Sequence, residues 1–341
     1  MLMNKIKKLL VMPKEEIFFR IAEQRIEKRE YKDHLSGKDR LSHENFIQKY
    51  GDFPSKKDVA QVLFEDFYSG KRDHFFTEGY AKEGRATQIK KYLNTQSWLL
   101  EADRICKGQL FLLGKNVRLA QAGEWHKDPL EACEWPRIFY KQVSKNKPSV
   151  TVDIKYVWEM NRHQYLIVLG KAYWISGNEK YAQKVREIIS SWIEDNPYHS
   201  GVNWTSSLEL AVRSISWIWA YFFCRGSEHM DAAFHFMFLK SVYEQGLHIE
   251  QHLSYYSSPY NHLIGEAAGL HMIGSLFSQL KAGQAWETLG WSIFENNIEK
   301  QFFDDGMCVE QATFYHHFTL GFYLQATQLR KINKKPVSSK V

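Results

Sequence analysis

The residues best suited to acid–base chemistry lie in one short stretch, Tyr260 to Leu270, which follows a loop rich in serine and tyrosine. Asn261 and His262 stand where that loop meets an apolar run, and Glu266 follows one turn later. Residues i and i+4 share a helix face, so His262 and Glu266 are predicted to lie on one side of a helix. The first helical turn also offers free N–H groups and a positive dipole end, which suit a carboxylate ligand. The alternative is an Asn261 N-cap beside an ordinary near-surface histidine.

A second polar stretch, residues 304–318, begins with an Asp-Asp-Gly turn and brings Glu310, Tyr315, His316 and His317 to the start of a helix. Such polar density beside aromatic residues is costly unless the groups are paired or functional. Tyr315 can both donate and accept a proton, and His316 is a neighbour able to hydrogen-bond to it. A capped helix with surface histidines is the alternative. Adjacent helical residues point apart, so a metal site at His316 and His317 is not expected.

A third stretch, residues 201–220, sets Glu209 and Arg213 in an otherwise apolar and aromatic helix, just after Asn203 and Trp204. Their i, i+4 spacing predicts an ion pair along the helix. We expect this pair to be buried and to brace the loop that carries Asn203 and Trp204. A purely structural ion pair is an equally good interpretation.

A fourth stretch, residues 153–165, places Trp158, Glu159, Arg162 and His163 on about one helical turn. These are again polar groups within an apolar pattern, so they are predicted to face a site or to be paired.

Composition limits the classes of protein that fit. The chain has 341 residues, of which 44% are hydrophobic and 15% aromatic, which is enough for a large core and for flat platforms that stack on ligands. The net charge of +6 is a mild excess that suits an acidic polymer. The four cysteines are scattered without metal-ligand spacing, so we expect free thiols of a reducing compartment. No apolar run reaches transmembrane length. We therefore expect no cofactor, no metal, no nucleic-acid partner and no membrane span.

The first residues do not predict a secretion signal. The start is basic, but its apolar stretch runs only from Leu9 to Met12, too short for the core of a signal peptide. The default location is cytoplasmic, and the periplasm is the alternative.

The spacing of hydrophobic residues and the position of helix-breaking residues predict a mainly α fold. Residues 13–34 are predicted to form a helix with an apolar stripe at Ile17, Phe18, Ile21 and Ile26, and residues 102–119 a β-hairpin with a Gly-Lys-Asn turn. Further helices are expected at 59–68, 156–176, 179–194, 206–224, 229–253, 263–280, 283–303 and 313–332. Short polar connections favour antiparallel helical hairpins, which suits an α/α toroid, with a plain α-solenoid as the alternative. The expected division is an irregular and helical α+β extension over 1–100, the toroid over 101–332 and a basic frayed tail over 333–341.

The motifs together resemble a known family. Taken in order they are Asp153, Trp158-Glu159, Asn161-Arg162-His163, Asn203-Trp204, Ser207-Leu208-Glu209, Arg213, Asn261-His262, Gly265-Glu266, Asp305-Gly306, Glu310-Gln311 and Tyr315-His316. This order, over roughly residues 100–330, resembles the N-terminal region of the heparinase II/III-like polysaccharide lyases. The resemblance implies an incomplete α/α toroid followed by an antiparallel β-sandwich, and cleavage of uronic-acid polysaccharides by β-elimination.

The resemblance also implies roles for single residues. Asn261, His262 and Tyr315 match the catalytic positions. The implied substrate-binding set is Trp158, Arg162, His163, Asn203, Trp204, Glu209, Arg213, Glu266, Glu310 and His316. The expected ligand is an acidic polysaccharide or oligosaccharide.

One feature of the family is not matched, because the sequence stops at Val341, where the β-sandwich should begin. We therefore expect a truncated lyase of reduced activity, completed by a separately encoded β-sandwich domain. The alternatives are a carbohydrate-binding remnant without catalysis and a helical protein-interaction scaffold. A glycoside hydrolase on the same fold would need two carboxylates about 5–10 Å apart across a cleft.

Overall fold

Helices dominate the part of the chain that the structure describes. The structure is a computed structural model, and it describes residues 12–39, 41–50, 59–69, 72–76, 82–131, 133–148 and 152–341. The basic start considered above as a leader lies outside the described residues, except for Met12 and Pro13.

The first third of the chain contains mostly short elements. They are α2 (Lys14–Leu35), α3 (His43–Tyr50), α4 (Val59–Tyr68), α5 (Lys82–Tyr92), α6 (Gln96–Cys106), β1 (Gln109–Leu112), β2 (Lys115–Arg118) and α7 (Tyr140–Val143). The remainder is α8 (Ile154–Asn161), α9 (Leu166–Ser176), α10 (Glu179–Asp195), the 3-10 helix η1 (Val202–Trp204), α11 (Ser207–Cys224), α12 (Ala232–Gln251), α13 (Asn261–Leu276), α14 (Gly283–Gln301) and α15 (Thr313–Ile332).

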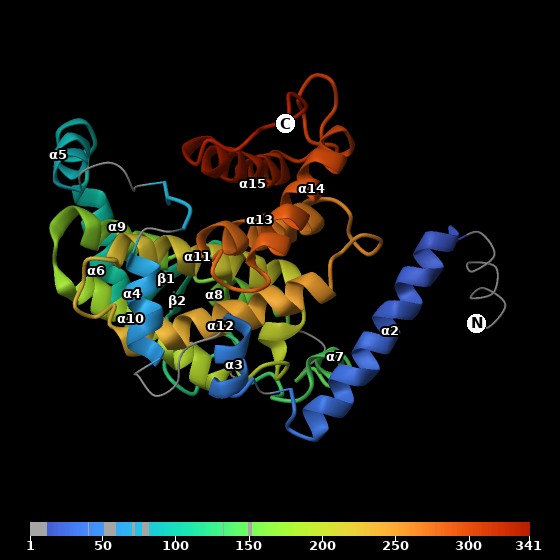
Figure 1. Cartoon of the computed structure of the whole chain (residues 1–341). Coiled ribbons are helices and arrows are strands. Elements are labelled where there is room, and N and C mark those ends of the chain that lie inside the picture. The colour runs from blue at the N-terminus through green and yellow to red at the C-terminus, as the bar shows by residue number, and fades with distance from the viewer. Residues whose placement is uncertain are drawn as a thin grey trace.

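The long helices form two layers, as expected for an incomplete α/α toroid (Figure 1). Helices α9, α11, α13 and α15 pack against one another in that order. Helices α10, α12 and α14 each pack on the preceding member of that row, which makes the hairpins α9–α10, α11–α12 and α13–α14. Nearly every residue of α11 and α13 is buried, because both helices have neighbours on several sides. The predicted mainly α fold class is therefore confirmed.

Local sequence signals explain where these helices begin and end. Helix α9 ends at Gly177, whose φ of 69° is a left-handed conformation that costs glycine little. The next residue, Asn178, caps α10 by accepting a hydrogen bond from the Lys180 backbone N–H. Asp231 caps α12 in the same way, accepting from the Phe234 N–H at 2.8 Å. The connections within the hairpins α9–α10 and α11–α12 are therefore short and fixed.

Helices α13 and α14 approach closely because glycines face the contact. A β-carbon added at Gly274 would lie 2.4 Å from both the Glu287 nitrogen and the Gly283 oxygen. One added at Gly290 would lie 2.5 Å from the Ala267 oxygen. Backbone atoms cannot move aside as a flexible side chain can, so these positions require glycine.

The predicted β-hairpin is confirmed, with a small change in its turn. Strands β1 and β2 pair antiparallel, with Leu112 opposite Lys115. Leu113 and Gly114 therefore form a two-residue turn, and both have positive φ, at 47° and 79°. The expected Gly-Lys-Asn turn is wrong by one or two residues, because Lys115 and Asn116 already belong to β2.

The single helix predicted over 156–176 is wrong. The structure breaks it into α8 and α9, and His163, between them, has a φ of 55°. Two tertiary contacts explain the break: the His163 Nδ1 accepts a hydrogen bond from the Trp217 indole at 2.8 Å, and Arg162 bonds to Glu209. Local periodicity cannot reveal partners that lie about 50 residues away.

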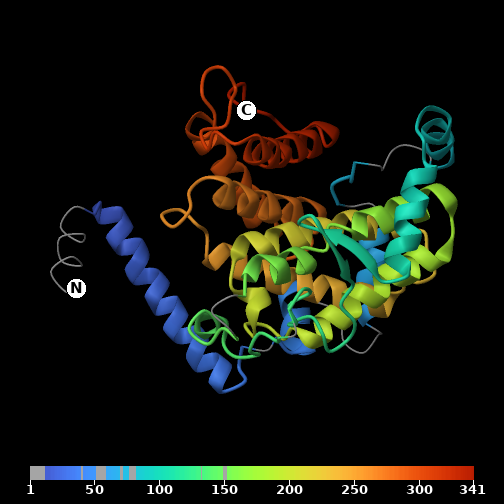
Figure 2. The same ribbon diagram turned by 180° about the vertical axis from the view of Figure 1, so that it is seen from behind.

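The two ends of the chain match the expectations to different extents. The helix predicted over 13–34 is confirmed as α2, which lies along one side of the molecule (Figure 2), and Phe18 of its apolar stripe is 71% exposed. The residue of α2 that is buried is Glu30. The basic tail is not frayed, because the Lys335 Nζ lies 2.5 Å from an Asp73 carboxylate oxygen and 2.7 Å from a Glu287 oxygen.

Candidate functional site

The centre of the candidate site is the first turn of α13, where a carboxylate from a distant loop holds Asn261. The Asn261 Nδ2 donates to the Glu310 Oε1 at 2.7 Å, and the Asn261 backbone N–H donates to the Glu310 Oε2 at 3.2 Å. Glu310 lies in the loop between α14 and α15. A carboxylate only accepts hydrogen bonds, so this contact fixes which end of the amide is the nitrogen. One N–H of that nitrogen is used by Glu310, and the other can serve a ligand.

His262 lies next to this clamp and is half-buried. Burial lowers the pKa of its imidazole, while the carboxylates of Glu209 and Glu310 act in the opposite direction and the Arg162 guanidinium adds to the lowering. The imidazole is therefore neutral at neutral pH, with one nitrogen that donates and one that accepts. Glu310 is bonded to the neighbouring Asn261, and Arg162 and Glu209 are bonded to each other, so their charges are near enough to act on the ionisation of His262.

Arg162 and Glu209 form the ion pair of the site. The Arg162 Nε and Nη2 donate to the two Glu209 oxygens at 2.6 and 2.9 Å, and the Nη1 donates to Glu159 at 2.9 Å. Burial opposes the charge of Arg162, but the bonds to Glu209 and Glu159 outweigh it and raise its pKa. The predicted Glu209–Arg213 pair is wrong: Glu209 is buried and paired as expected, but its partner is Arg162, at the C-terminal end of α8.

Arg213 is fully buried and has a different task. Its Nε donates to the Gln245 Oε1 at 3.0 Å, its Nη2 donates to the Asn203 carbonyl at 3.2 Å, and its guanidinium stacks 4.0 Å from the Trp192 ring centre. Burial lowers its pKa to about 9. Arg213 therefore holds the backbone of η1, which agrees with the expected bracing of the Asn203 loop.

Several residues expected to bind substrate are covered by the protein itself. The members that are at most 3% exposed are His163, Asn203, Trp204, Glu209, Arg213 and Glu266. Side chains covered to this extent do not touch a polymer in this conformation, so their expected contact role is corrected to a positioning one. Asn203 shows how: its Nδ2 donates to the Trp125 carbonyl at 3.0 Å and to the Asn196 Oδ1 at 2.8 Å.

Glu266 anchors the loop that leads into the site. Its two oxygens accept hydrogen bonds from the Ser254 N–H and the Ser254 hydroxyl, both at 2.7 Å. Burial raises the pKa of this carboxyl to about 8, although the Ser254 bonds act against that rise. Sequence analysis missed Ser254, because nothing in the local pattern shows which serine of that loop turns inward.

Tyr315 and His316 lie on the first turn of α15, five and six residues after Glu310. Tyr315 is 42% exposed, and the ring of Phe318, one turn later on the same helix, lies 6.0 Å from the Arg162 guanidinium. This end of α15 therefore borders the site, but among the described residues Tyr315 has no hydrogen bond to Asn261 or His262. The His316 Nδ1 accepts from the Cys308 backbone N–H at 3.3 Å, which supports the 302–308 turn, and its expected substrate contact stays a prediction.

Trp158 lies at the edge of this region and is partly exposed. Its indole N–H donates to the Thr205 hydroxyl at 3.2 Å, which joins α8 to the residue after η1. The structure thus brings together Asn261, His262, Arg162, Glu209 and Glu310, and it leaves Trp158 and Tyr315 at the margin.

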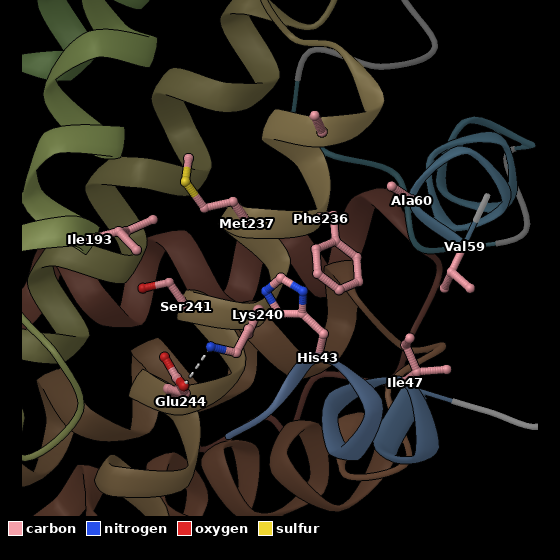
Figure 3. A pocket seen from close by; sticks show the side chains of 11 residues that line it. His43, Ile47, Val59, Ala60, Ile193, Phe236, Met237, Lys240, Ser241 and Glu244 are labelled. Carbon is pink, nitrogen blue, oxygen red and sulfur yellow. Dashed lines mark ion pairs between the residues drawn. The ribbon is translucent and has the colours of Figure 1, made fainter. Parts of the chain in front are cut away.

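One pocket of the molecule lies apart from this cluster, and another lies beside it. The pocket of about 600 Å³ shown in Figure 3 lies at the junction of α3 and α4 with α12 and shares no residue with the cluster. A pocket of about 460 Å³ is lined by Tyr260 and Leu263, on either side of Asn261 and His262.

Within the described ranges, no three His, Cys, Asp or Glu residues are grouped to hold a metal ion. None of the helices in those ranges is long and apolar enough to cross a bilayer.

Comparison with known proteins gives consistent matches. Residues 108–338 match the family described as Heparinase II/III N-terminus. A heparin-sulfate lyase of Bacteroides thetaiotaomicron is 30% identical over 190 residues, which cover 55% of this chain and 26% of that protein. One from Bacteroides stercoris is 26% identical over 192 residues, covering 50% of this chain and 28% of that protein. The matched region is thus about a quarter of the length of these relatives.

The fold is shared with solved structures as well. The crystal structure of a heparan sulfate lyase from Pedobacter heparinus superposes with a TM-score of 0.54 at 20% identity, covering 91% of this chain and 43% of that one. At this identity the likeness concerns the fold alone.

Proposed function

Because the chain belongs to the heparinase II/III N-terminus family, we propose that it supplies the helical part of a lyase that cleaves an acidic polysaccharide by β-elimination. The substrate class is a uronic-acid-containing polymer, because β-elimination requires a carboxylate next to the carbon that loses its proton. The single observation that carries the proposal is the Asn261–Glu310 clamp beside a neutral His262.

The chemistry assigns a task to Asn261, which is 6% exposed, to His262 and to Tyr315. Removing the C5 proton of a uronate builds negative charge on its carboxylate, and hydrogen-bond donors placed there stabilise that charge. The second N–H of the Asn261 amide and the N–H of the His262 imidazole are such donors. The Tyr315 oxygen takes the C5 proton as its hydroxyl gives its own proton to the glycosidic oxygen. The C4–O bond breaks as the C4=C5 double bond forms, and no proton is gained or lost overall.

The cluster around His262 contains more carboxylates than cations, so it lacks positive charge for an anionic substrate. Arg162 is the cation, and it is already bonded to two carboxylates, while Glu310 adds a third. A uronate that approaches His262 therefore meets more negative than positive charge, and more so once water is excluded. The relatives extend well beyond the matched region, and we propose that a β-sandwich domain completes the cleft and supplies the missing charge or proton-transfer group.

Turnover of a uronate polymer tests the proposal, followed as the absorbance of the unsaturated product. It is measured on this chain alone and with the β-sandwich domain of a relative added. Tyr315→Phe is expected to lower turnover by at least about 100-fold while binding stays near the wild-type level. Tyr92→Phe is the matched control, because Tyr92 is 75% exposed on α5 and belongs to no part of the site. Equal turnover by the Tyr315→Phe and Tyr92→Phe variants would show that the proton carrier is misassigned.

A carbohydrate-binding protein without turnover is the second candidate, and one observation favours it. One N–H of the Asn261 amide already donates to Glu310, so only the other remains for a ligand. Saturable binding of an acidic oligosaccharide with no unsaturated product, even with the added domain, would select this alternative.

A further inference from the structure

The pocket of about 460 Å³ beside Asn261 has the features of a second sugar site. It lies between the loop that precedes α13 and the last turns of α14. Tyr255, Tyr256 and Tyr260 line it from the loop, and Asn297 and Lys300 line it from α14. A wall of aromatic rings opposite an ammonium and an amide combines flat faces for a sugar ring with donors for its polar groups.

The tyrosines are accessible although their loop is held in place. They are 36%, 37% and 46% exposed, in the order Tyr255, Tyr256 and Tyr260. Phe19 of α2 packs against Tyr255 and Tyr256, with ring centres 5.9 and 5.2 Å apart.

Two hydrogen-bonded anchors fix the ends of the same loop. The Gln301 Nε2 donates to the Pro259 carbonyl at 2.9 Å, and Ser254 is bonded to the buried Glu266. A surface held in this way loses little conformational entropy when a ligand binds, so it is preorganised for one.

Lys300 carries the charge that the cluster around His262 needs. Its side chain is exposed, and among the described residues it has no carboxylate partner. The adjacent Glu299 bonds instead to Lys340, at 3.2 Å. Lys300 lies in the last turn of α14, where the helix dipole favours a cation. An anionic sugar placed here gains an attraction that the carboxylate-rich cluster does not provide.

We propose that this pocket is a subsite for an anionic sugar unit adjoining the unit bound at Asn261. The sugar ring lies against the tyrosines, and its sulfate or carboxylate group contacts Lys300. Position supports the assignment, because Tyr260 lines the pocket and is the residue immediately before Asn261. The inference rests on the proposed function, since it takes its ligand from the same acidic polymer.

Binding of defined oligosaccharides tests the subsite. The probes are a sulfated uronate oligosaccharide and its desulfated counterpart of equal length, titrated into wild-type protein, Lys300→Gln and Lys281→Gln. Lys281 is the matched control, because it is an exposed lysine beyond the opposite end of α14, about 25–30 Å away at 1.5 Å per residue. Lys300→Gln is expected to raise Kd about three- to tenfold and to weaken its dependence on salt, while Lys281→Gln leaves both unchanged.

The two probes distinguish the sources of the anionic group. An effect of Lys300→Gln on the sulfated probe alone assigns the contact to sulfate, and an equal effect on both probes assigns it to a carboxylate. Tyr256→Ala is expected to weaken binding of both probes, because the aromatic platform serves any sugar ring.

Two outcomes would overturn the subsite. One is a Lys300→Gln variant that binds both probes as Lys281→Gln does, and the other is a wild-type chain that binds neither probe. The result is separable from the reaction assignment: if Tyr315→Phe keeps full turnover while Lys300→Gln weakens binding, the assigned proton carrier fails and the subsite stands.

Discussion

The ion pair between Arg162 and Glu209 predicts an asymmetry between its two partners. The Glu209 side chain is 3% exposed, while those of Arg162 and Glu159 are each 19% exposed. Arg162→Met leaves two adjacent carboxylates without their cation, one of them almost fully buried. Stranding a buried charge in this way costs about 3–5 kcal/mol.

Glu209→Gln should be milder. Arg162 keeps its 2.9 Å bond to Glu159, and the glutamine oxygen still accepts one hydrogen bond. What is lost is one charge-assisted bond to a partly exposed group, or about 1–2 kcal/mol. Combining Arg162→Met with Glu209→Gln strands neither charge of the pair, so the double variant should cost less than the sum of the single ones.

Urea unfolding followed by tryptophan fluorescence measures these differences in the free energy of unfolding. Lys184→Met is the control, because it breaks an exposed pair with Glu187, whose members are 28% and 50% exposed. That change should cost no more than about 0.5 kcal/mol. The reasoning fails if Arg162→Met is no more destabilising than Glu209→Gln, or if the double variant equals the sum of the two.

Two further predictions concern the hairpin of α13 and α14 and the helix that follows. Burial raises the pKa of Glu266 from an ordinary value near 4.5 to about 8, so between these pH values the folded protein holds a proton that the unfolded chain has released. Stability should therefore fall as pH rises from about 5 to 8, by up to about 4–5 kcal/mol, and unfolding of Glu266→Gln at both ends of this range should show a smaller fall. Gly290→Ala should lower the melting temperature strongly, because its β-carbon would lie 2.5 Å from a backbone oxygen. Gly321→Ala in α15 is the control: its β-carbon would meet nothing within 4 Å, so this change should stabilise the protein by about 0.5–1 kcal/mol. Similar melting temperatures for these two alanine variants would refute the close-packing argument.

The layered fold was predictable because its signals are local. Gly177 and Asn178 mark a helix end and the next start in any context, and the structure uses both as caps. The hairpin of β1 and β2 follows from a glycine between two short apolar runs. Signals of this kind need no knowledge of distant parts of the chain.

The pairing of polar groups was not predictable, because it depends on which helices become neighbours. Glu209 and Arg213 are four residues apart, yet Glu209 bonds to Arg162, 47 residues earlier in the chain. The break at His163 has the same origin, since its partner Trp217 lies 54 residues away. A local i, i+4 contact on a helix surface is worth only a few tenths of a kcal/mol, so a bidentate partner from another helix easily replaces it.

The polar residues at the helix ends have two different roles, and burial separates them. Arg162 joins α8 to α11, the Ser207 hydroxyl joins α11 to the end of α12 at 3.0 Å, and Glu310 joins the start of α13 to the loop before α15. These bonds link elements that are neighbours in space, and they account for much of the polar density seen in the sequence. Among the described residues, the half-buried His262 and the more exposed Tyr315 take part in none of these bonds and keep their capacity for proton transfer or donation. The same bonds hold in place the elements that carry His262 and Tyr315. A variant that breaks such a bond should therefore lower the stability of the fold, and it should affect catalysis only by displacing these two side chains.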